Sequence, residues 1–261
     1  MINKHSHCNG KAVVYENFLT EEQCDTLYKF MDTYDYEKLD SYMFAKYFEK
    51  RQLSKKQLAL QPKYKNDLDP IQPILDDIIN KMYELLNSEG DTKEWIAGEP
   101  VLMRIFKDGI PEDHPGNRNE GMFLHVDDQP WMEGKVIWGT VIYLNNDYVG
   151  GELYYPEYDH YYKPKRKDLV MHAGDIVHGV TEVTSGTRYA VTITLRIKGE
   201  YNNNPLPVKE YGMGDGFYYY PPGYWGKRMP DDPTPGDVKN PRSDGTFAPY
   251  NDNPTAYVPK I

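Results

Sequence analysis

Residues 175–195 read D-I-V-H-G-V-T-E-V-T-S-G-T-R-Y-A-V-T-I-T-L, and this part of the sequence gives the clearest indication of the fold class. It holds two runs rich in Val, Ile and Thr on either side of the turn signal T-S-G-T, and such runs favour β-strands. Successive short strands without helices between them predict an antiparallel sandwich or barrel. The pattern begins near residue 99, and we expect strands at 99–106, 136–144, 151–155, 168–171, 175–180 and 188–197.

Two helices are predicted before these strands. The first begins after Thr20, whose hydroxyl can cap it with Gln23 as the capping-box partner, and Cys24 then reads as a small buried apolar residue. In the second, apolar residues from 71 to 86 follow the i, i+3, i+4, i+7 rhythm of an amphipathic helix, and Gly90 is a natural stop. We expect this apolar stripe to pack on the outer face of the sheet.

The last 61 residues, 201–261, differ from the rest in composition. They hold 11 of the 20 prolines and 11 aromatic residues, with almost no periodic pattern. Proline opposes regular structure, whereas disordered tails are usually poor in aromatics. We therefore expect an ordered, irregular extension in which residues 217–225 pack on the core or on a second subunit, the latter making a homo-oligomer.

The bulk composition excludes several classes of protein. The 261 residues carry a net charge of −10 and a pI of about 5.2, which disfavours nucleic acid as a partner. We expect the one basic run, K-P-K-R-K at 163–167, to be a solvated turn between strands. Cys8 and Cys24 cannot make a disulfide framework, and no apolar run is long enough for a signal peptide or a membrane span. A cytoplasmic location without a membrane partner is the expectation.

The string F-L-H-V-D-D at 123–128 carries the first sign of chemistry. On a strand, His125 and Asp127 point to the same side, so both can aim into a barrel and hold one cation. An iron(II) site with open positions needs two imidazoles and one carboxylate on one face of an octahedron. In a chain with 7 histidines and 40 acidic residues such a pair also arises by chance, so its weight depends on the motifs that follow.

Those motifs come in a characteristic order. H-x-D at 125–127 is followed by Y-L-N at 143–145, by G-G-E at 150–152 and by H-x-V-x-x-V-x-x-G-x-R-Y at 178–189. In this order they resemble the catalytic domain of the prolyl 4-hydroxylase-like 2-oxoglutarate/iron(II) oxygenases. The match spans residues 99–198, and F-L-T-E-E-Q-C-D at 18–25 is similar to the family's opening strand and helix.

The resemblance implies a mainly β fold, the double-stranded β-helix or jelly roll. Its core would occupy residues 99–200. Residues 1–98 would supply an N-terminal strand and helices that support this core, and residues 201–261 would form the irregular extension.

The resemblance also implies a metal site. His125 and Asp127 would be the proximal ligands and His178 the distal one. His172 is the alternative for the distal position. It precedes A-G-D, whereas His178 is followed by an arginine ten positions on, which is the family spacing. We therefore expect His178 to be the ligand.

The same comparison implies a site for 2-oxoglutarate. Arg188 falls where the family places the basic residue for the distal carboxylate, and a guanidinium fork can hold a carboxylate through two parallel bonds. Tyr143, in Y-L-N, matches a tyrosine that hydrogen-bonds the same carboxylate. Thr192, four positions after Arg188, points to the same side of its strand and is a further candidate for the pocket.

The expected function is therefore that of an enzyme. It would use iron(II), 2-oxoglutarate and O₂, with ascorbate as an accessory reductant, to hydroxylate a C–H bond. Asp127 favours hydroxylation, because halogenating relatives replace this carboxylate with a small residue. The expected substrate is a prolyl or similar residue in a peptide or protein, and a free amino acid or other small metabolite is the alternative.

Some features leave other readings open. Relatives often carry a tyrosine on the strand before H-x-D, where this chain has Ile105 or Phe106, so the substrate is not a simple inference from the family. A non-catalytic jelly roll that binds a peptide or sugar is a second class, and an assembly protein whose aromatic extension docks a partner is a third. An intact metal triad together with Arg188 argues against the non-catalytic jelly roll, and succinate release would distinguish the enzyme from both.

Overall fold

The computed structural model describes residues 3–35, 50–53, 58, 63–91, 93–106, 122–128, 135–181 and 183–197. The predicted extension at 201–261, with its aromatic segment at 217–225, lies outside these residues.

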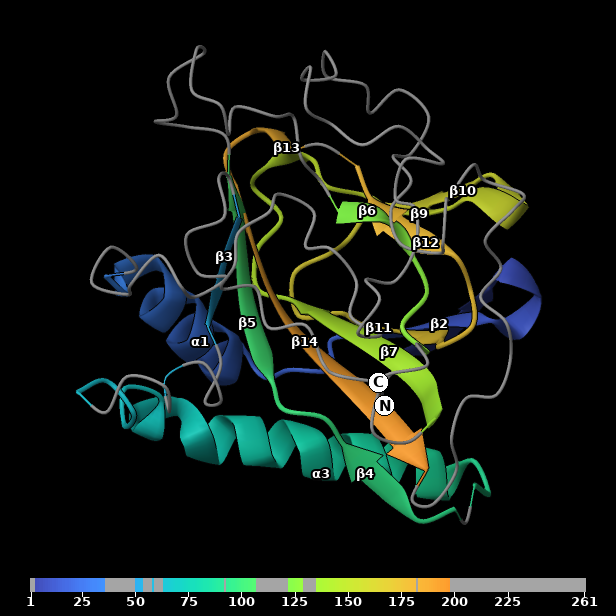
Figure 1. Ribbon diagram of the computed structural model, residues 1–261, viewed down its shortest axis with the longest axis horizontal. Coiled ribbons are helices and arrows are strands. Elements are labelled where there is room, and N and C mark those ends of the chain that lie inside the picture. The colour runs from blue at the N-terminus through green and yellow to red at the C-terminus, as the bar shows by residue number, and fades with distance from the viewer. Residues whose placement is uncertain are drawn as a thin grey trace, which may run out of the picture.

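A large antiparallel sheet forms the base of the fold (Figure 1). Its strands follow the spatial order β1-β2-β11-β7-β14-β5-β3, and β4 pairs with the end of β14. Four of them, β1 to β4, come from residues before 99, so the N-terminal region extends the sheet made by the later strands. The bounds are β1 Asn3–His7, β2 Ala12–Glu16, β3 Lys50–Leu53, β4 Trp95–Ala97, β5 Val101–Phe106, β7 Lys135–Tyr143, β11 Leu169–Ala173 and β14 Thr187–Ile197.

A small four-stranded sheet of order β10-β9-β12-β6 faces the large one, and β13 and β8 form a separate two-stranded pair. The apolar side chains of both sheets share one core, in which Leu153 and Tyr155 of the small sheet meet Val141 and Val170 of the large one. Two facing antiparallel sheets of this kind make the expected jelly roll. The bounds are β6 Met122–His125, β8 Val149–Gly150, β9 Leu153–Tyr155, β10 His160–Tyr162, β12 His178–Val180 and β13 Val183–Ser185.

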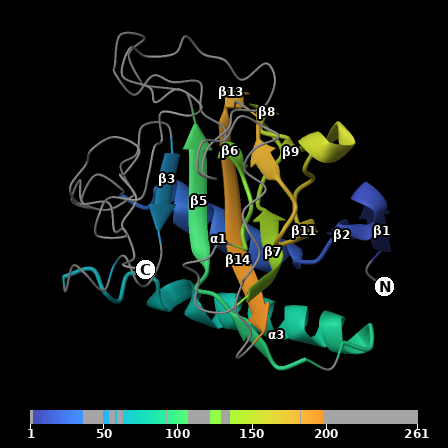
Figure 2. The same ribbon diagram turned by 45° about the vertical axis from the view of Figure 1, so that its right-hand side comes forward.

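Two helices cover the other side of the large sheet, as the sequence predicts (Figures 1 and 2). Helix α1 spans Glu21–Thr33 and begins with the predicted capping box of Thr20 and Gln23. Helix α3 spans Gln72–Ser88, and the chain leaves it through Gly90 at a positive φ of 83°. Short 3-10 turns lie at Cys8–Gly10, Asp69–Ile71 and Pro156–Tyr158. Among the described residues, no helix has the length and apolar character needed to cross a membrane.

The alternation along β14 explains why chemistry can lie between the sheets. Tyr189, Val191, Ile193 and Leu195 belong to the core that the helices cover. Successive side chains of a strand point to opposite faces, so Arg188 turns toward the small sheet, where Ala190 packs in the inter-sheet core. Strand β14 thus contributes apolar side chains to the core beneath the helices and a polar side chain, Arg188, to the space between the sheets.

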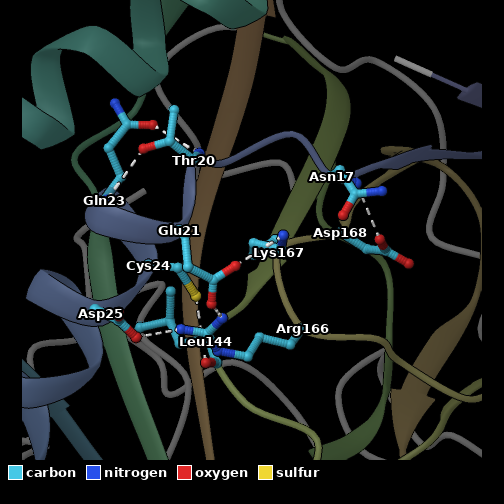
Figure 3. A network of polar contacts seen from close by, with 10 residues as sticks. All are labelled: Asn17, Thr20, Glu21, Gln23, Cys24, Asp25, Leu144, Arg166, Lys167 and Asp168. Atoms are coloured by element: carbon cyan, nitrogen blue, oxygen red, sulfur yellow. Dashed lines mark hydrogen bonds and ion pairs between the residues drawn. The ribbon is translucent and has the colours of Figure 1, made fainter. Parts of the chain in front are cut away.

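The basic run at 163–167 is the connection between β10 and β11, and acidic residues neutralise it (Figure 3). Arg166 pairs with Glu21 and Asp25 near the beginning of α1, and Lys167 Nζ lies 2.9 Å from Glu21 Oε2. These pairs tie helix α1 to the turn before β11. Exposed ion pairs contribute little each, so their main effect is to neutralise the local charge.

The predicted strands are observed with shifted boundaries, and two of the differences concern the site. The segment expected to be a strand at 175–180 is strand only from His178, because residues 174–176 form a turn. The H-x-D string is strand only as far as His125, so Asp127 lies in a bend beyond the end of β6. Alternation along a strand is therefore not what orients Asp127.

Candidate functional site

Three side chains meet at one end of the space between the sheets: Asp127, His172 and His178. One potential ligand atom from each lies within 4.8 Å of the others. Asp127 Oδ2 is 3.1 Å from His172 Nε2 and 3.9 Å from His178 Nε2. Both imidazoles are buried, whereas the carboxylate is 20% exposed. Imidazoles and a carboxylate are the donor types that suit iron(II), so this part of the fold fits a metal, and the hydrogen bonds of each ring decide whether it can be a ligand.

The neighbours of His178 determine which of its nitrogens can bind. Its Nδ1 lies 3.1 Å from the carbonyl oxygen of Ile176. A carbonyl can only accept a hydrogen bond, so Nδ1 carries the proton and donates it. The lone pair is then on Nε2, the nitrogen that faces Asp127. A ligand histidine commonly has its other nitrogen held in this way, so the geometry favours His178 as a ligand.

His125 enters the site through its backbone position. In the antiparallel pairing of β6 with β12, the Cα of His125 lies opposite the Cα of His178. The side chain of His125 lies outside the described residues. Its register next to His178 and two residues before Asp127 is the placement that the predicted triad requires, and its role as a ligand stays a prediction.

Asp128 fixes the backbone beside Asp127. Its amide donates to the Gly174 carbonyl over 2.8 Å, and its carboxylate accepts from the amide of Val136 over 2.9 Å. Burial raises the pKa of Asp128, and the hydrogen bond from Val136 opposes that shift. These bonds tie the segment beyond β6 to the beginning of β7 and to the turn before β12.

Gly139 makes room for the metal end, and sequence analysis missed it. On β7 it lies opposite His172 of β11, and a Cβ at this position would lie 1.7 Å from Asp127 Oδ2 and 2.5 Å from His172 Nε2. Any side chain would therefore displace the cluster. The available signal was a glycine inside the strand V-I-W-G-T-V-I-Y, which often marks a close approach.

Arg188 lies at the other end of the space between the sheets. Its guanidinium carbon lies 4.9 Å from the ring centroid of Tyr143, and both side chains are almost completely buried. Among the described residues, Arg188 Nε and Nη1 and the hydroxyls of Tyr143 and Tyr148 have no hydrogen-bond partner. A buried cation without a partner is costly, so this group of donors fits an anionic ligand. A dicarboxylate that reaches from the metal to Arg188 would satisfy it.

Tyr148 is the second residue that sequence analysis missed. It is buried, and a Cβ on Gly151 would lie 2.8 Å from its Cε2 and 3.0 Å from Arg188 Cδ, so the two side chains share that small space. Burial raises the pKa of Tyr143 and of Tyr148, and the Arg188 charge opposes the shift in both. Both phenols therefore keep their protons and act as donors.

Two further positions considered in the sequence, Thr192 and Ile105, lie on β14 and β5. Thr192 is half-buried, and its hydroxyl donates to the Val101 carbonyl over 3.5 Å, toward the backbone of β5. Ile105 is buried opposite Arg188 in the pairing of β14 with β5. The apolar Ile105 thus lies beside Arg188 on the neighbouring strand β5.

Comparison with known proteins supports the fold. No protein-family model and no curated protein sequence matches the chain. Among solved structures, it is similar to a viral collagen prolyl hydroxylase from Paramecium Bursaria Chlorella virus-1 in complex with 2-oxoglutarate, with a TM-score of 0.51 and 17% identity over 73% of this chain and 98% of that one.

A second solved structure, of prolyl 4-hydroxylases from Phytophthora capsici, gives a TM-score of 0.51 and 17% identity over 76% of this chain and 63% of that one. Identities this low speak for the fold alone. The chain has the jelly-roll fold of the prolyl 4-hydroxylase-like 2-oxoglutarate/iron(II) oxygenases, and the resemblance seen in its sequence is confirmed at that level.

Proposed function

We propose that this protein is a 2-oxoglutarate- and iron(II)-dependent dioxygenase that hydroxylates a C–H bond. One observation carries the proposal: the buried donors of Arg188, Tyr143 and Tyr148 share the inter-sheet space with the cluster of Asp127 and His178. A metal site alone suits many functions. A metal site together with a buried cation that has no anionic partner in the described part of the chain suits a ligand with a chelating end and a carboxylate end.

Each end of the pocket has its own task. His125, Asp127 and His178 would hold the iron, and Arg188 and Tyr143 would hold the distal carboxylate of 2-oxoglutarate. Thr192 would line the pocket between them. Bound iron supplies, with 2-oxoglutarate and O₂, the oxidising power for C–H hydroxylation. The protein binds and orients the reactants, and the sheets exclude water from them.

The proposed substrate is a prolyl or similar residue in a peptide or protein. The similar solved structures are a collagen prolyl hydroxylase and prolyl 4-hydroxylases, which supports this class. Free amino acids or other small metabolites are the alternative. The proposal includes ascorbate as accessory reductant, a cytoplasmic location and a subunit contact through residues 201–261.

The test is succinate release on adding iron(II), 2-oxoglutarate and O₂ to the full chain. We expect turnover in the wild type, with loss in Asp127→Ala and His178→Ala and no loss in His5→Gln, a histidine exposed on β1. Product mass would then be followed with proline-containing peptides and with free metabolites, where hydroxylation adds one oxygen. A protein that binds metal and peptide but never forms succinate is a non-catalytic jelly roll, and the proposal fails.

A further inference from the structure

His172 has a place in the site that the proposed triad does not require. It lies on β11 of the large sheet, 1% exposed, whereas Asp127 and His178 follow or belong to strands of the small sheet. Its Nε2 is 3.1 Å from Asp127 Oδ2, and its ring centroid is 3.9 Å from that of His178. His172 therefore reaches across the inter-sheet space to the ligands.

The partners of the ring indicate its tautomer. An ionised carboxylate only accepts hydrogen bonds, so the nitrogen that faces Asp127 carries the proton. The other nitrogen, Nδ1, then has the lone pair, and the hydroxyl of Tyr155 lies 3.5 Å from it as a long hydrogen-bond donor. Burial raises the pKa of Tyr155 strongly, so the phenol keeps the proton that it donates.

The two histidines thus present opposite nitrogens to the carboxylate. His178 has its proton on Nδ1, donated to the Ile176 carbonyl, and faces Asp127 with a lone pair on Nε2. His172 faces Asp127 with an N–H. A nitrogen that carries a proton cannot bind a cation, so this arrangement makes one ring a ligand and the other a donor to a ligand.

Asp127 accepts this hydrogen bond at a place where no strand orients its carboxylate. It lies in a bend beyond β6, and the hydrogen bonds of Asp128 fix only the neighbouring backbone. Gly139 leaves the space in which the carboxylate and the imidazole meet. The hydrogen bond from His172 is therefore a link between the two sheets at the point where the carboxylate has to be held.

We propose that His172 is a positioning residue, which holds Asp127 through its Nε2–H while Tyr155 holds the ring. The carboxylate then presents its metal-binding oxygen in one fixed direction. The inference rests on the proposed metal site. The rival arrangement makes His172 itself a ligand through Nε2, and would give the metal a fourth protein group.

The test compares His172→Ala with His172→Gln in the full chain, because the glutamine amide can place an N–H close to the position of Nε2. Cobalt(II) affinity is measured by calorimetry without 2-oxoglutarate, and thermal melting of the metal-free proteins controls for folding. We expect the alanine variant to bind cobalt about 10–100-fold more weakly, the effect typical of groups that support a ligand. Glutamine should recover most of the loss, and His5→Gln should bind as the wild type does.

A second measurement separates the two roles of His172. Pulsed electron paramagnetic resonance of the copper(II)-loaded protein counts coordinated imidazoles, and this count should be the same in the wild type and His172→Gln. Loss of one imidazole in the variant would make His172 a ligand and overturn the inference, as would unchanged cobalt affinity in His172→Ala. If the wild type binds no divalent cation, the inference and the proposed function both fail. If metal binding behaves as expected but succinate is never released, only the proposed function fails.

Discussion

At the metal end of the space between the sheets, the polar side chains form hydrogen bonds within the protein. At the carboxylate end, several buried donors form none among the described residues. Asp127 is bonded to His172, and His178 to a backbone carbonyl. Arg188 Nε and Nη1 and the hydroxyls of Tyr143 and Tyr148 lack hydrogen-bond partners among the described residues, although all three side chains are buried. The two ends lie between the same sheets and differ in what they demand of a ligand.

Because of this difference, ligand binding should gain more free energy at the carboxylate end than at the metal end. A group that already has a partner loses little when a ligand is absent, so the metal end can keep its geometry by itself. A buried donor without a partner has lost its water and gained nothing in return. An anion at the carboxylate end therefore offsets a cost that folding has already imposed, and the following changes test this contrast.

The largest expected effect is at Arg188. Arg188→Ala removes one partner of a buried charge pair, which costs about 3–5 kcal/mol, or roughly two to four decades in 2-oxoglutarate affinity. Arg188→Lys keeps the charge and should recover part of it. Affinity is measured by calorimetry on the cobalt-loaded protein, and cobalt binding itself should not change. Unchanged 2-oxoglutarate affinity in the alanine variant would remove Arg188 from the site.

The next effect is at Gly139. Gly139→Ala places a methyl group where Asp127 Oδ2 and His172 Nε2 meet, so we expect cobalt affinity to fall by about 100-fold, at the upper end of the losses seen when ligand support is disturbed. The Asp127 side chain can move aside, so the metal-free protein should keep its fold, as circular dichroism would report. Normal metal binding in this variant would show that the ligands lie elsewhere.

The two phenols provide a finer comparison. Tyr143→Phe and Tyr148→Phe each remove one hydrogen bond to a charged group, which is worth about 1.5–3 kcal/mol, so 2-oxoglutarate affinity should fall roughly 10-fold or more. Cobalt affinity serves as the internal control. If Tyr143→Phe has the effect and Tyr148→Phe has none, Tyr148 is a core residue rather than a carboxylate donor.

The smallest effect is on the stability of the ligand-free protein, and here the two ends should differ in sign. Arg188→Met replaces a buried cation, which has no anionic partner among the described residues, by an apolar chain and should stabilise the protein by about 1 kcal/mol or more. His172→Leu leaves Asp127 and Tyr155 without that partner and should destabilise it by about 1–3 kcal/mol. Urea unfolding measures both. The contrast between the ends collapses if the two variants shift stability in the same direction.

Much of this protein could be predicted from local sequence signals. The capping box at Thr20, the apolar rhythm of α3 and the strand rich in Val, Ile and Thr that bears Arg188 each act over a few residues, and each appears in the fold. The ten-residue spacing between His178 and Arg188, on which the choice of His178 over His172 was based, can likewise be read from the sequence. Asp127 was less predictable, because a strand was expected where the structure has a bend.

The class of fold and most of the candidate residues could be predicted from the sequence alone, because alternation and spacing can be read directly along the chain. Which of these side chains contact one another depends on the tertiary fold. His172 and Asp127 are 45 positions apart, and Tyr148 lies 40 positions before Arg188. Contacts of this kind depend on which strands face one another, and on the space that Gly139 leaves between them. No local pattern encodes that, since it arises only when two sheets close over a common interior.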